Sequence, residues 1–232
     1  MLPDRACRKL GWAVMSDPYQ GPDENKLKAD VAMIGEAWND NPYYVDAERW
    51  TFLFWRPEGH FRQLFDRLDL TSVVELACGH GRHAEQIVNQ VGRLVLMDIF
   101  EANLDRCRAR LQGPTNVEFI SGDGYTFKPL ADSSTTAIFC YDAMVHFSSD
   151  LVASYLKDAQ RILVPGGLAL LHHSNYGCPH EGHYGQNPHA RNYMTQALFG
   201  CLAQDARLEV VESRVIPWGE ESELDCLSLC RK

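Results

Sequence analysis

From residue 71 to the C-terminus, short apolar runs alternate with segments whose apolar residues recur at helical spacing. Seven runs have the length and composition of buried strands: SVVELA, RLVLMDI, VEFISG, TTAIFCYDA, GLALLHH, LEVVESRV and LDCLSLC. Four segments have the helical pattern: RHAEQIVNQV, EANLDRCRARL, DLVASYLKDAQRIL and YMTQALFGCLAQDA. Alternating strands and helices predict an α/β fold with a doubly wound, parallel sheet.

The first seventy residues have a different character. Residues 1–35 are rich in Pro, Gly, Asp and Lys without clear periodicity, which predicts a flexible N-terminal arm. Residues 36–70 hold many aromatic side chains, and EGHFRQLFDRL within them has the apolar spacing of a helix. We therefore expect an aromatic helical lid over 36–70, which covers the sheet edge of a main domain at 71–232 and excludes water from its site.

The composition excludes several function classes. The formal net charge is −9 and no run of Lys or Arg exceeds two residues, so we expect no nucleic-acid partner. The apolar runs are too short to span a bilayer, and the N-terminus lacks the apolar stretch of a secretory signal. Eight irregularly spaced cysteines without a C-x-x-C motif indicate reduced thiols. These features predict a cytoplasmic protein without a membrane partner, and they leave a homodimer open.

The stretch VVELACGHGRHAEQ is the most specific motif in the chain. A hydrophobic strand runs into a turn with Gly79 and Gly81, and a helical segment follows at once. Glycines at such a turn let a ligand approach the backbone closely, and a helix N-terminus offers free N–H groups. Seventeen residues after Gly81 the next strand ends at Asp98, where a carboxylate can hold both ribose hydroxyls of an adenine nucleoside. The third strand ends in SGDGY, whose Asp123 can accept a hydrogen bond from the adenine amino group.

The residues at two positions help to distinguish a dinucleotide from a ligand that carries a positive charge. A dinucleotide site usually has a third glycine in G-x-G-x-x-G, and Ala84 occupies that position here. Glu75, inside the first strand, suits a ligand that carries an ammonium or sulfonium group and repels a pyrophosphate. The pattern therefore disfavours a nicotinamide-dependent oxidoreductase.

These motifs resemble those of class I S-adenosylmethionine-dependent methyltransferases over about residues 71–232. ELACGHG is similar to the first motif of that family, MD at 97–98 to its ribose acid and GDG to its adenine-side acid. CYDAMVHF is similar to the fourth motif, and LVPGGLALLHH to the segment that leads into the fifth strand. The resemblance implies a Rossmann-like, seven-stranded sheet in the order 3-2-1-4-5-7-6 with an antiparallel last strand. Ala77 stands where the family commonly has a glycine, and we expect a negative φ there.

The resemblance also implies which residues hold S-adenosyl-L-methionine, the expected cofactor. Glu75 and the Ala77–Gly81 turn would hold the methionine moiety, Asp98 the ribose, and Asp123 with Gly124 the adenine end. The full set of expected cofactor-binding residues is Glu75, Ala77, Cys78, Gly79, Gly81, Arg82, Asp98, Ile99, Asn103, Gly122, Asp123, Gly124 and Tyr141.

The stretch HHSNYGCPHEGHYGQNPHARNYM, called the histidine loop below, follows the fifth strand and holds five of the nine histidines. Ligands of open α/β sheets bind at the carboxyl ends of the strands, so we expect this long connection to form a wall of the acceptor pocket. The spacings of its four potential metal ligands, Cys178, His180, His183 and His189, match no common zinc pattern, so we expect no metal. The expected substrate contacts are Tyr44, Trp55, Asn175, Tyr176 and His189.

The chemistry of methyl transfer indicates the candidate catalytic residues. The enzyme must align the acceptor for in-line displacement and keep its attacking atom deprotonated. Four candidates lie at the ends of the fourth and fifth strands: Asp142, His146, His172 and His173. His172 and His173 point to opposite faces of the sheet, so we expect at most one of them to face the ligand.

The sequence thus predicts a methyltransferase of the EC 2.1.1 class that acts on a small polar metabolite. The polar histidine loop and the acidic composition favour N-methylation of an amine- and hydroxyl-rich acceptor, such as an amino sugar or an aminoglycoside. The stretch HHSN…HARNYM is also similar to methyltransferases of sugar and antibiotic biosynthesis. O-methylation of a sugar or another small molecule, and a non-catalytic nucleoside-binding module, stay open as alternatives.

Overall fold

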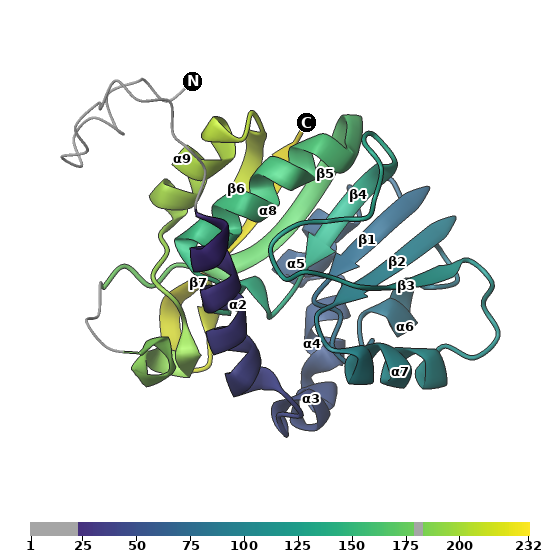
Figure 1. The fold of residues 1–232 in the computed structure, drawn as a ribbon, viewed down its shortest axis with the longest axis horizontal. Helices are drawn as coiled ribbons and strands as arrows, with labels where there is room; N and C mark the ends of the chain where they lie inside the picture. Colours follow the sequence, from purple (N-terminus) through teal and green to yellow (C-terminus); the bar gives the residue numbers. More distant parts are fainter. Residues whose placement is uncertain (1–22, 179–182) are drawn as a thin grey trace.

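The structure, a computed structural model, describes residues 23–178 and 183–232, and its centre is one seven-stranded sheet (Figure 1). The strands are β1 (Ser72–Leu76), β2 (Arg93–Asp98), β3 (Val117–Ser121), β4 (Thr135–Cys140), β5 (Leu163–Ser174), β6 (Glu209–Trp218) and β7 (Glu221–Arg231). They lie in the order β3-β2-β1-β4-β5-β7-β6. β1 to β5 pair in parallel, whereas β7 is antiparallel to both of its neighbours. The predicted fold class, strand order and antiparallel last strand are confirmed.

Two helical layers cover the sheet. One face packs against α5 (His60–Phe65), α6 (Ala84–Ile87) and α7 (Glu101–Arg110), and the other against α8 (Ser149–Ile162) and α9 (Gln196–Asp205). Apolar side chains are buried on both faces of the central strands, as at Val73 and Val74, which explains why these strands are continuous apolar runs. The helix expected over 82–91 is shorter than predicted, since only the single turn α6 forms there.

An additional helix, α2 (Glu24–Trp38), lies in front of the sheet next to α8 (Figure 1). The prediction of a flexible arm over 1–35 is therefore wrong for residues 24–35, and residues 1–22 lie outside the described part of the chain. Asp23 caps the helix by accepting a hydrogen bond from the Asn25 backbone N–H. Leu27 and Ile34 are buried on one stripe of α2 against Leu151 of α8, and this burial orders the helix.

The segment expected as an aromatic lid is helical. It contains α3 (Tyr43–Asp46), the 3₁₀ turn η1 (Ala47–Trp50), α4 (Thr51–Trp55) and α5. Three further 3₁₀ turns are η2 (Met144–His146), η3 (Tyr184–Gln186) and η4 (Pro188–Ala190). The movement of a lid, the domain limits at 35 and 70, and the homodimer stay predictions.

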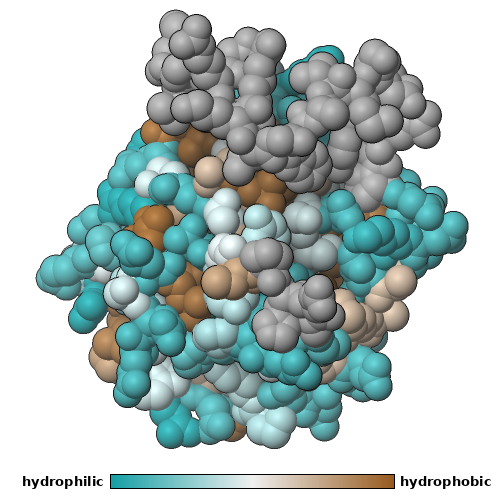
Figure 2. All heavy atoms as spheres, turned by 90° about the vertical axis from the view of Figure 1, so that its left-hand side faces the viewer, coloured by the Kyte–Doolittle hydropathy of each residue, from teal (hydrophilic) through white to brown (hydrophobic). Residues whose placement is uncertain are grey.

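The face on the left of Figure 1 is mostly hydrophilic, and its apolar side chains form small, separate patches (Figure 2). Across residues 23–178 and 183–232, no helix has both the length and the apolar character needed to cross a membrane.

Candidate active site

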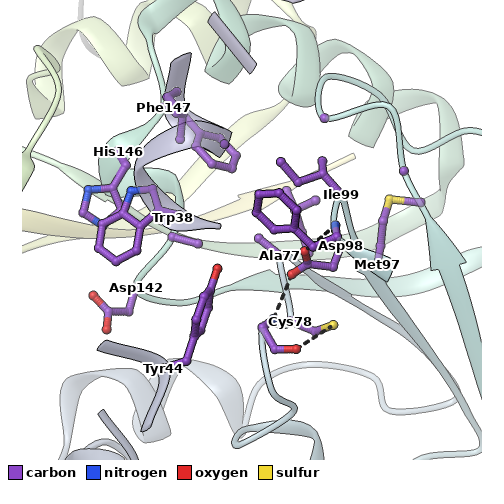
Figure 3. Close-up of a pocket in the computed structure, with 18 of the residues that line it drawn as sticks. Trp38, Tyr44, Ala77, Cys78, Met97, Asp98, Ile99, Asp142, His146 and Phe147 are labelled. Atoms are coloured by element: carbon purple, nitrogen blue, oxygen red, sulfur yellow. Dashed lines mark hydrogen bonds between the residues drawn. The ribbon is translucent and has the colours of Figure 1, made fainter. Parts of the chain in front are cut away.

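A cavity opens at the carboxyl ends of β1, β2 and β4 and the loop after β3. Strand ends and loops form its floor, and α2 and α3 cover it (Figure 3). This is the edge at which open α/β sheets bind ligands. Eleven of the expected site residues line it: Tyr44, Ala77, Cys78, Gly79, Arg82, Asp98, Ile99, Gly122, Gly124, Asp142 and His146.

The turn after β1 has the backbone shape expected of a close ligand approach. Gly79 has a φ of 53° and Gly81 one of 76°, in the left-handed region that favours glycine. A Cβ on Gly79 would lie 3.0 Å from Tyr44 Cε1, whereas one on Gly81 would lie 3.0 Å from Cys107 Sγ in α7. The lack of a Cβ at Gly79 therefore leaves room for Tyr44 at the cavity wall, whereas the lack of a Cβ at Gly81 lets the turn pack against α7. The expectation of a negative φ at Ala77 is wrong: its φ is 54°, which strains a residue with a Cβ.

Asp98 presents a fixed carboxylate at the end of β2. Its Oδ2 accepts from the Gly79 N–H at 2.9 Å, and its Oδ1 accepts from the Phe100 N–H at 2.9 Å and from Asn103 Nδ2 at 3.2 Å. Burial raises the pKa of this carboxyl, while the hydrogen bonds from Phe100 and Gly79 oppose the rise. Asn103 lies off the cavity wall and acts on the site by orienting Asp98.

Glu75 and Asp123, both expected to contact the cofactor, do not line this cavity. Glu75 is fully buried, its pKa is raised well above the ordinary value by burial and then by Cys107, and its Oε2 has no partner among the described residues. The alternation of side chains along β1 turns Glu75 away from the face on which Leu76 reaches the cavity. Asp123 borders a shallow groove beside the cavity, where its carboxylate accepts from the backbone N–H groups of Tyr125 at 2.9 Å and Thr126 at 2.7 Å.

His146, in η2 after β4, lines the acceptor end of the cavity. Its ring stacks on Trp38 of α2, with the centroids 4.3 Å apart, and its Nδ1 lies 2.8 Å from the Ala190 carbonyl oxygen (Figure 3). Because a carbonyl only accepts, Nδ1 carries the proton and Nε2 keeps its lone pair. No hydrogen bond reaches Nε2 from the described residues. Burial, and next the Arg191 charge, lower the pKa of His146 to about 4, so the ring is neutral near pH 7.

Asp142, also at the end of β4, is held on both sides. Its Oδ2 accepts from the Tyr43 hydroxyl at 2.5 Å and from Arg82 Nη2 at 2.8 Å. Its backbone N–H donates to His172 Nδ1 at 3.0 Å, and its φ of 59° is left-handed. The side chain is 1% exposed; its Oδ2 anchors Tyr43 and Arg82, while its Oδ1 has no hydrogen-bond partner among the described residues and lies 4.0 Å from Arg191 Nη2. Tyr43 and Trp38 also line the cavity, and the sequence predicts no site role for them beyond their place in the aromatic segment 36–70.

The expected catalytic roles of His172 and His173 are wrong as contacts, because both rings are fully buried in the sheet and neither lines the cavity. The two rings do lie on opposite faces, as expected. His172 stacks on Tyr141 at 4.5 Å, and His173 stacks on Phe199 of α9 at 3.9 Å. Burial lowers the pKa of His173 to about 3, as for a core histidine. Tyr141, an expected cofactor contact, packs in the same apolar layer as Phe61.

The expected substrate contacts from the histidine loop and Trp55 also lie off the cavity wall. Asn175 Oδ1 accepts from the Gln196 N–H at 2.9 Å at the start of α9, and the Tyr176 carbonyl accepts from the Met194 N–H. His189 lies against Gly219 on the far side of the loop. Trp55 Nε1 donates to His83 Nδ1 at 3.0 Å beneath α4.

The histidine loop is therefore not a wall of the pocket in its described part. It supports the site from behind, through the Ala190 carbonyl on His146. Within residues 23–178 and 183–232 no cluster of three His, Cys, Asp or Glu side chains has the geometry of a metal site. His180, one of the potential ligands, lies outside the described residues.

Comparisons with known proteins agree with this geometry. A family model described as "Methyltransferase domain" matches residues 73–167. A curated relative from Mycolicibacterium smegmatis, named "Probable S-adenosylmethionine-dependent methyltransferase", is 26% identical over 151 residues, which are 65% of this chain and 54% of the relative. The chain thus spans about half the length of the curated relative that it matches.

Solved structures share the fold at low sequence identity. An S-adenosylmethionine-dependent methyltransferase from Mesorhizobium loti has a TM-score of 0.61 at 14% identity, covering 74% of this chain and 97% of its own. Geranyl diphosphate C-methyltransferase from Streptomyces coelicolor, in complex with S-adenosyl-L-homocysteine, has a TM-score of 0.60 at 15% identity, covering 83% of this chain and 99% of its own. The strand order and these solved structures show the Rossmann-like fold, and over residues 73–167 the chain is similar to S-adenosylmethionine-dependent methyltransferases.

Proposed function

We propose that this chain transfers the methyl group of S-adenosylmethionine to the nitrogen of a small amine that binds in the cavity beside Trp38 and His146. The observation that carries the proposal is the neutral His146 ring, whose Nδ1–H is taken by the Ala190 carbonyl while Nε2 keeps its lone pair on the cavity wall. An acceptor N–H can donate to that lone pair, which aims the nitrogen's own lone pair at the methyl group.

The donor end of the cavity fits S-adenosylmethionine. Asp98 would accept from the ribose hydroxyls, the Gly79 turn would face the methionine moiety, and Ile99 and Gly124 would border the adenine. Gly124 is also packed closely against α2, because a Cβ on it would lie 2.6 Å from Val31 Cγ1. When bound there, the cofactor supplies an electrophilic methyl group on a sulfonium.

The residues at the acceptor end orient the amine more than they deprotonate it. A ring whose pKa is about 4 accepts a hydrogen bond at Nε2 but takes up no second proton at pH 7, and Oδ2 of the Asp142 carboxylate is occupied by Tyr43 and Arg82. The amine therefore has to lose its ammonium proton before transfer. The rate of methyl transfer should rise with pH until the pH reaches the pKa of the acceptor amine. Trp38 and Tyr44 add aromatic surfaces that exclude water.

The walls narrow the class of amine. Val31, Ile34, Leu76, Met97 and Phe147 give the cavity a largely apolar lining. This lining favours an amine with an apolar body over a densely hydroxylated one. N-methylation of an amino sugar or aminoglycoside, as in antibiotic biosynthesis, stays a prediction within the amine class. A small molecule suits an enclosed cavity, and the net charge of −9 disfavours nucleic acid.

A panel of acceptors tests the proposal. Purified protein is incubated with S-adenosylmethionine and an amino sugar, a polyamine, an arylalkylamine or the alcohol analogue of each, and products are read by mass spectrometry. We expect methylation of an amine, at a rate about tenfold or more lower in His146→Ala. His60→Ala, at an exposed histidine in α5, is the matched control and keeps the wild-type rate. Fragmentation that places the methyl group on oxygen would favour the O-methylation alternative, and donor binding without turnover on any acceptor would favour the nucleoside-binding module.

A further inference from the structure

A buried chain of polar contacts leads from the histidine loop to the acceptor end of the cavity. Arg191 forms a bidentate pair with Asp225 of β7, with Nε–Oδ1 at 2.9 Å and Nη2–Oδ2 at 2.6 Å. His172 Nε2 lies 3.0 Å from Asp225 Oδ2, and His172 Nδ1 lies 3.0 Å from the Asp142 backbone nitrogen. All of these side chains are almost fully excluded from solvent.

The hydrogen bonds of this chain fix the tautomer of His172. The Asp142 backbone N–H can only donate, so His172 Nδ1 accepts and the ring proton sits on Nε2, where it donates to Asp225. Burial would raise the pKa of the Asp225 carboxyl, but the interactions with His172 and Arg191 outweigh it and lower that pKa. The carboxylate therefore stays ionised and always presents an acceptor to His172 Nε2–H.

Aromatic rings fix the plane of His172. Tyr141 stacks on one side with centroids 4.5 Å apart and an interplanar angle of 26°, and Trp218 packs 5.4 Å away. Arg191 in turn lies 4.7 Å from the centroid of Trp218. The imidazole is thus held in orientation as well as in protonation state.

The end of the loop that supplies Arg191 is itself strained. His189 and Ala190 have φ angles of 48° and 53°, in the left-handed region that is unfavourable for a residue with a Cβ. A buried ion pair such as that of Arg191 and Asp225 seldom adds stability over an apolar core. The strained backbone and the buried ion pair therefore lie in the part of the loop that supports two groups of the site. The Ala190 carbonyl accepts a hydrogen bond from His146, and the contacts of Arg191 lead through Asp225 and His172 to Asp142. Backbone strain of this kind collects at functional sites.

We propose that His172, Asp225 and Arg191 are positioning residues for methyl transfer, which hold Asp142 in its left-handed conformation so that its carboxylate can fix Tyr43 and Arg82 at the acceptor end. This rests on the proposed function. The three residues do not line the cavity, and they act on Asp142 through the hydrogen bond from its backbone N–H to His172 and through Arg191 Nη2, which lies 4.0 Å from Asp142 Oδ1.

A double-mutant cycle separates positioning from mere stability. His172→Phe keeps a ring between Tyr141 and Trp218 but removes the Nδ1 acceptor, and we expect kcat to fall about tenfold to a hundredfold. Donor affinity, measured by calorimetry, should stay within about threefold. In an Asp142→Ala background the same substitution should cost almost no further kcat, although it should still lower the melting temperature. His172→Gln, whose amide can accept from Asp142 and donate to Asp225, should recover part of the lost rate.

Two results would overturn the positioning role. The first is an equal loss of kcat in both backgrounds, since His172 would then act on the fold alone. The second is a long-range ¹H–¹⁵N NMR spectrum that shows His172 protonated on Nδ1, because that nitrogen could not accept from Asp142. The spectrum needs no turnover. If wild-type protein methylated no acceptor, the proposed function and the positioning of its reaction would both fail, while the spectrum would still decide whether the chain of contacts holds Asp142.

Discussion

Asp98→Ala should weaken binding of the methyl donor or its demethylated product by about 2–3 kcal/mol, roughly 30- to 150-fold in Kd. Two ribose hydroxyls can donate to this carboxylate, and hydrogen bonds to a charged group contribute about 1.5–3 kcal/mol each. Asp98 is only 5% exposed and already carries three donors, so its desolvation cost is met on folding and not on binding. The loss of binding free energy in Asp98→Ala should therefore be well above the loss expected on removal of a surface contact.

Calorimetry with S-adenosyl-L-homocysteine measures this without turnover. Asp158→Ala is the matched control, since that carboxylate also accepts from a backbone N–H, that of Phe127, but lies off the cavity wall. It should lower stability and leave donor affinity near the wild-type value. In the wild type, the raised pKa of Asp98 should make donor affinity fall on acidification at a higher pH than an exposed aspartate would give. An Asp98→Ala Kd within threefold of wild type, or tight NAD binding in place of the donor, would refute the assignment of Asp98 to the ribose.

Three further substitutions or treatments test the site and its surroundings. Ala77→Gly should stabilise the protein by about 1 kcal/mol, because glycine relieves a φ of 54°; an unchanged or lower melting temperature would contradict the strain. His173 has a pKa lowered to about 3 against an unfolded value near 6.5, so its contribution to stability is present above pH 6.5 and is lost as pH falls toward 3. His173→Asn should therefore reduce the slope of unfolding free energy by about 1.4 kcal/mol per pH unit in that window, and identical slopes for the two proteins would show that His173 is not the titrating group. A chelator should leave methyl transfer within about twofold, whereas a loss restored by zinc or magnesium would argue for a metal and for O-methylation.

The parts of the fold that the sequence predicts well are those in which local residue types decide the backbone. Strands buried on both faces have to be continuous apolar runs, so β1, β2 and β4 are visible as such. The Gly79 turn and the position of Asp98 can also be predicted, because a few adjacent residues are enough to indicate a left-handed turn or an acid at the end of a strand. The helix α2 was missed since only Leu27 and Ile34 of its apolar stripe are buried, among exposed Lys, Asp and Glu residues.

The roles of the buried histidines depend on partners far along the chain. Asp225 lies 53 positions after His172, and Arg191 pairs with Asp225 across 34 positions. No short-range pattern indicates such a contact, so the sequence alone predicts a catalytic role for histidines at the strand ends next to the site. The alternation along β5 correctly predicts that His172 and His173 face opposite sides, but only tertiary packing shows that both sides are filled.

The charges at the acceptor end favour an uncharged acceptor. Arg82 pairs with Asp142 and Arg191 with Asp225, so two buried cations meet two buried anions while His146 is neutral. An ammonium group would add a third positive charge beside these two pairs, where the one carboxylate oxygen of the pairs without a hydrogen bond, Asp142 Oδ1, already lies 4.0 Å from Arg191 Nη2, and an incompletely paired charge is costly in buried surroundings. A neutral amine adds no charge and supplies the N–H that His146 Nε2 lacks. The net charge of −9 attracts the cationic form of an amine from solution, but the site selects the form that has lost its proton. The protein surface therefore attracts the protonated amine, whereas the cavity binds the neutral amine. The apparent affinity for the acceptor should rise with pH, because the neutral fraction of the amine rises while the protonation of His146 and of the two ion pairs stays the same.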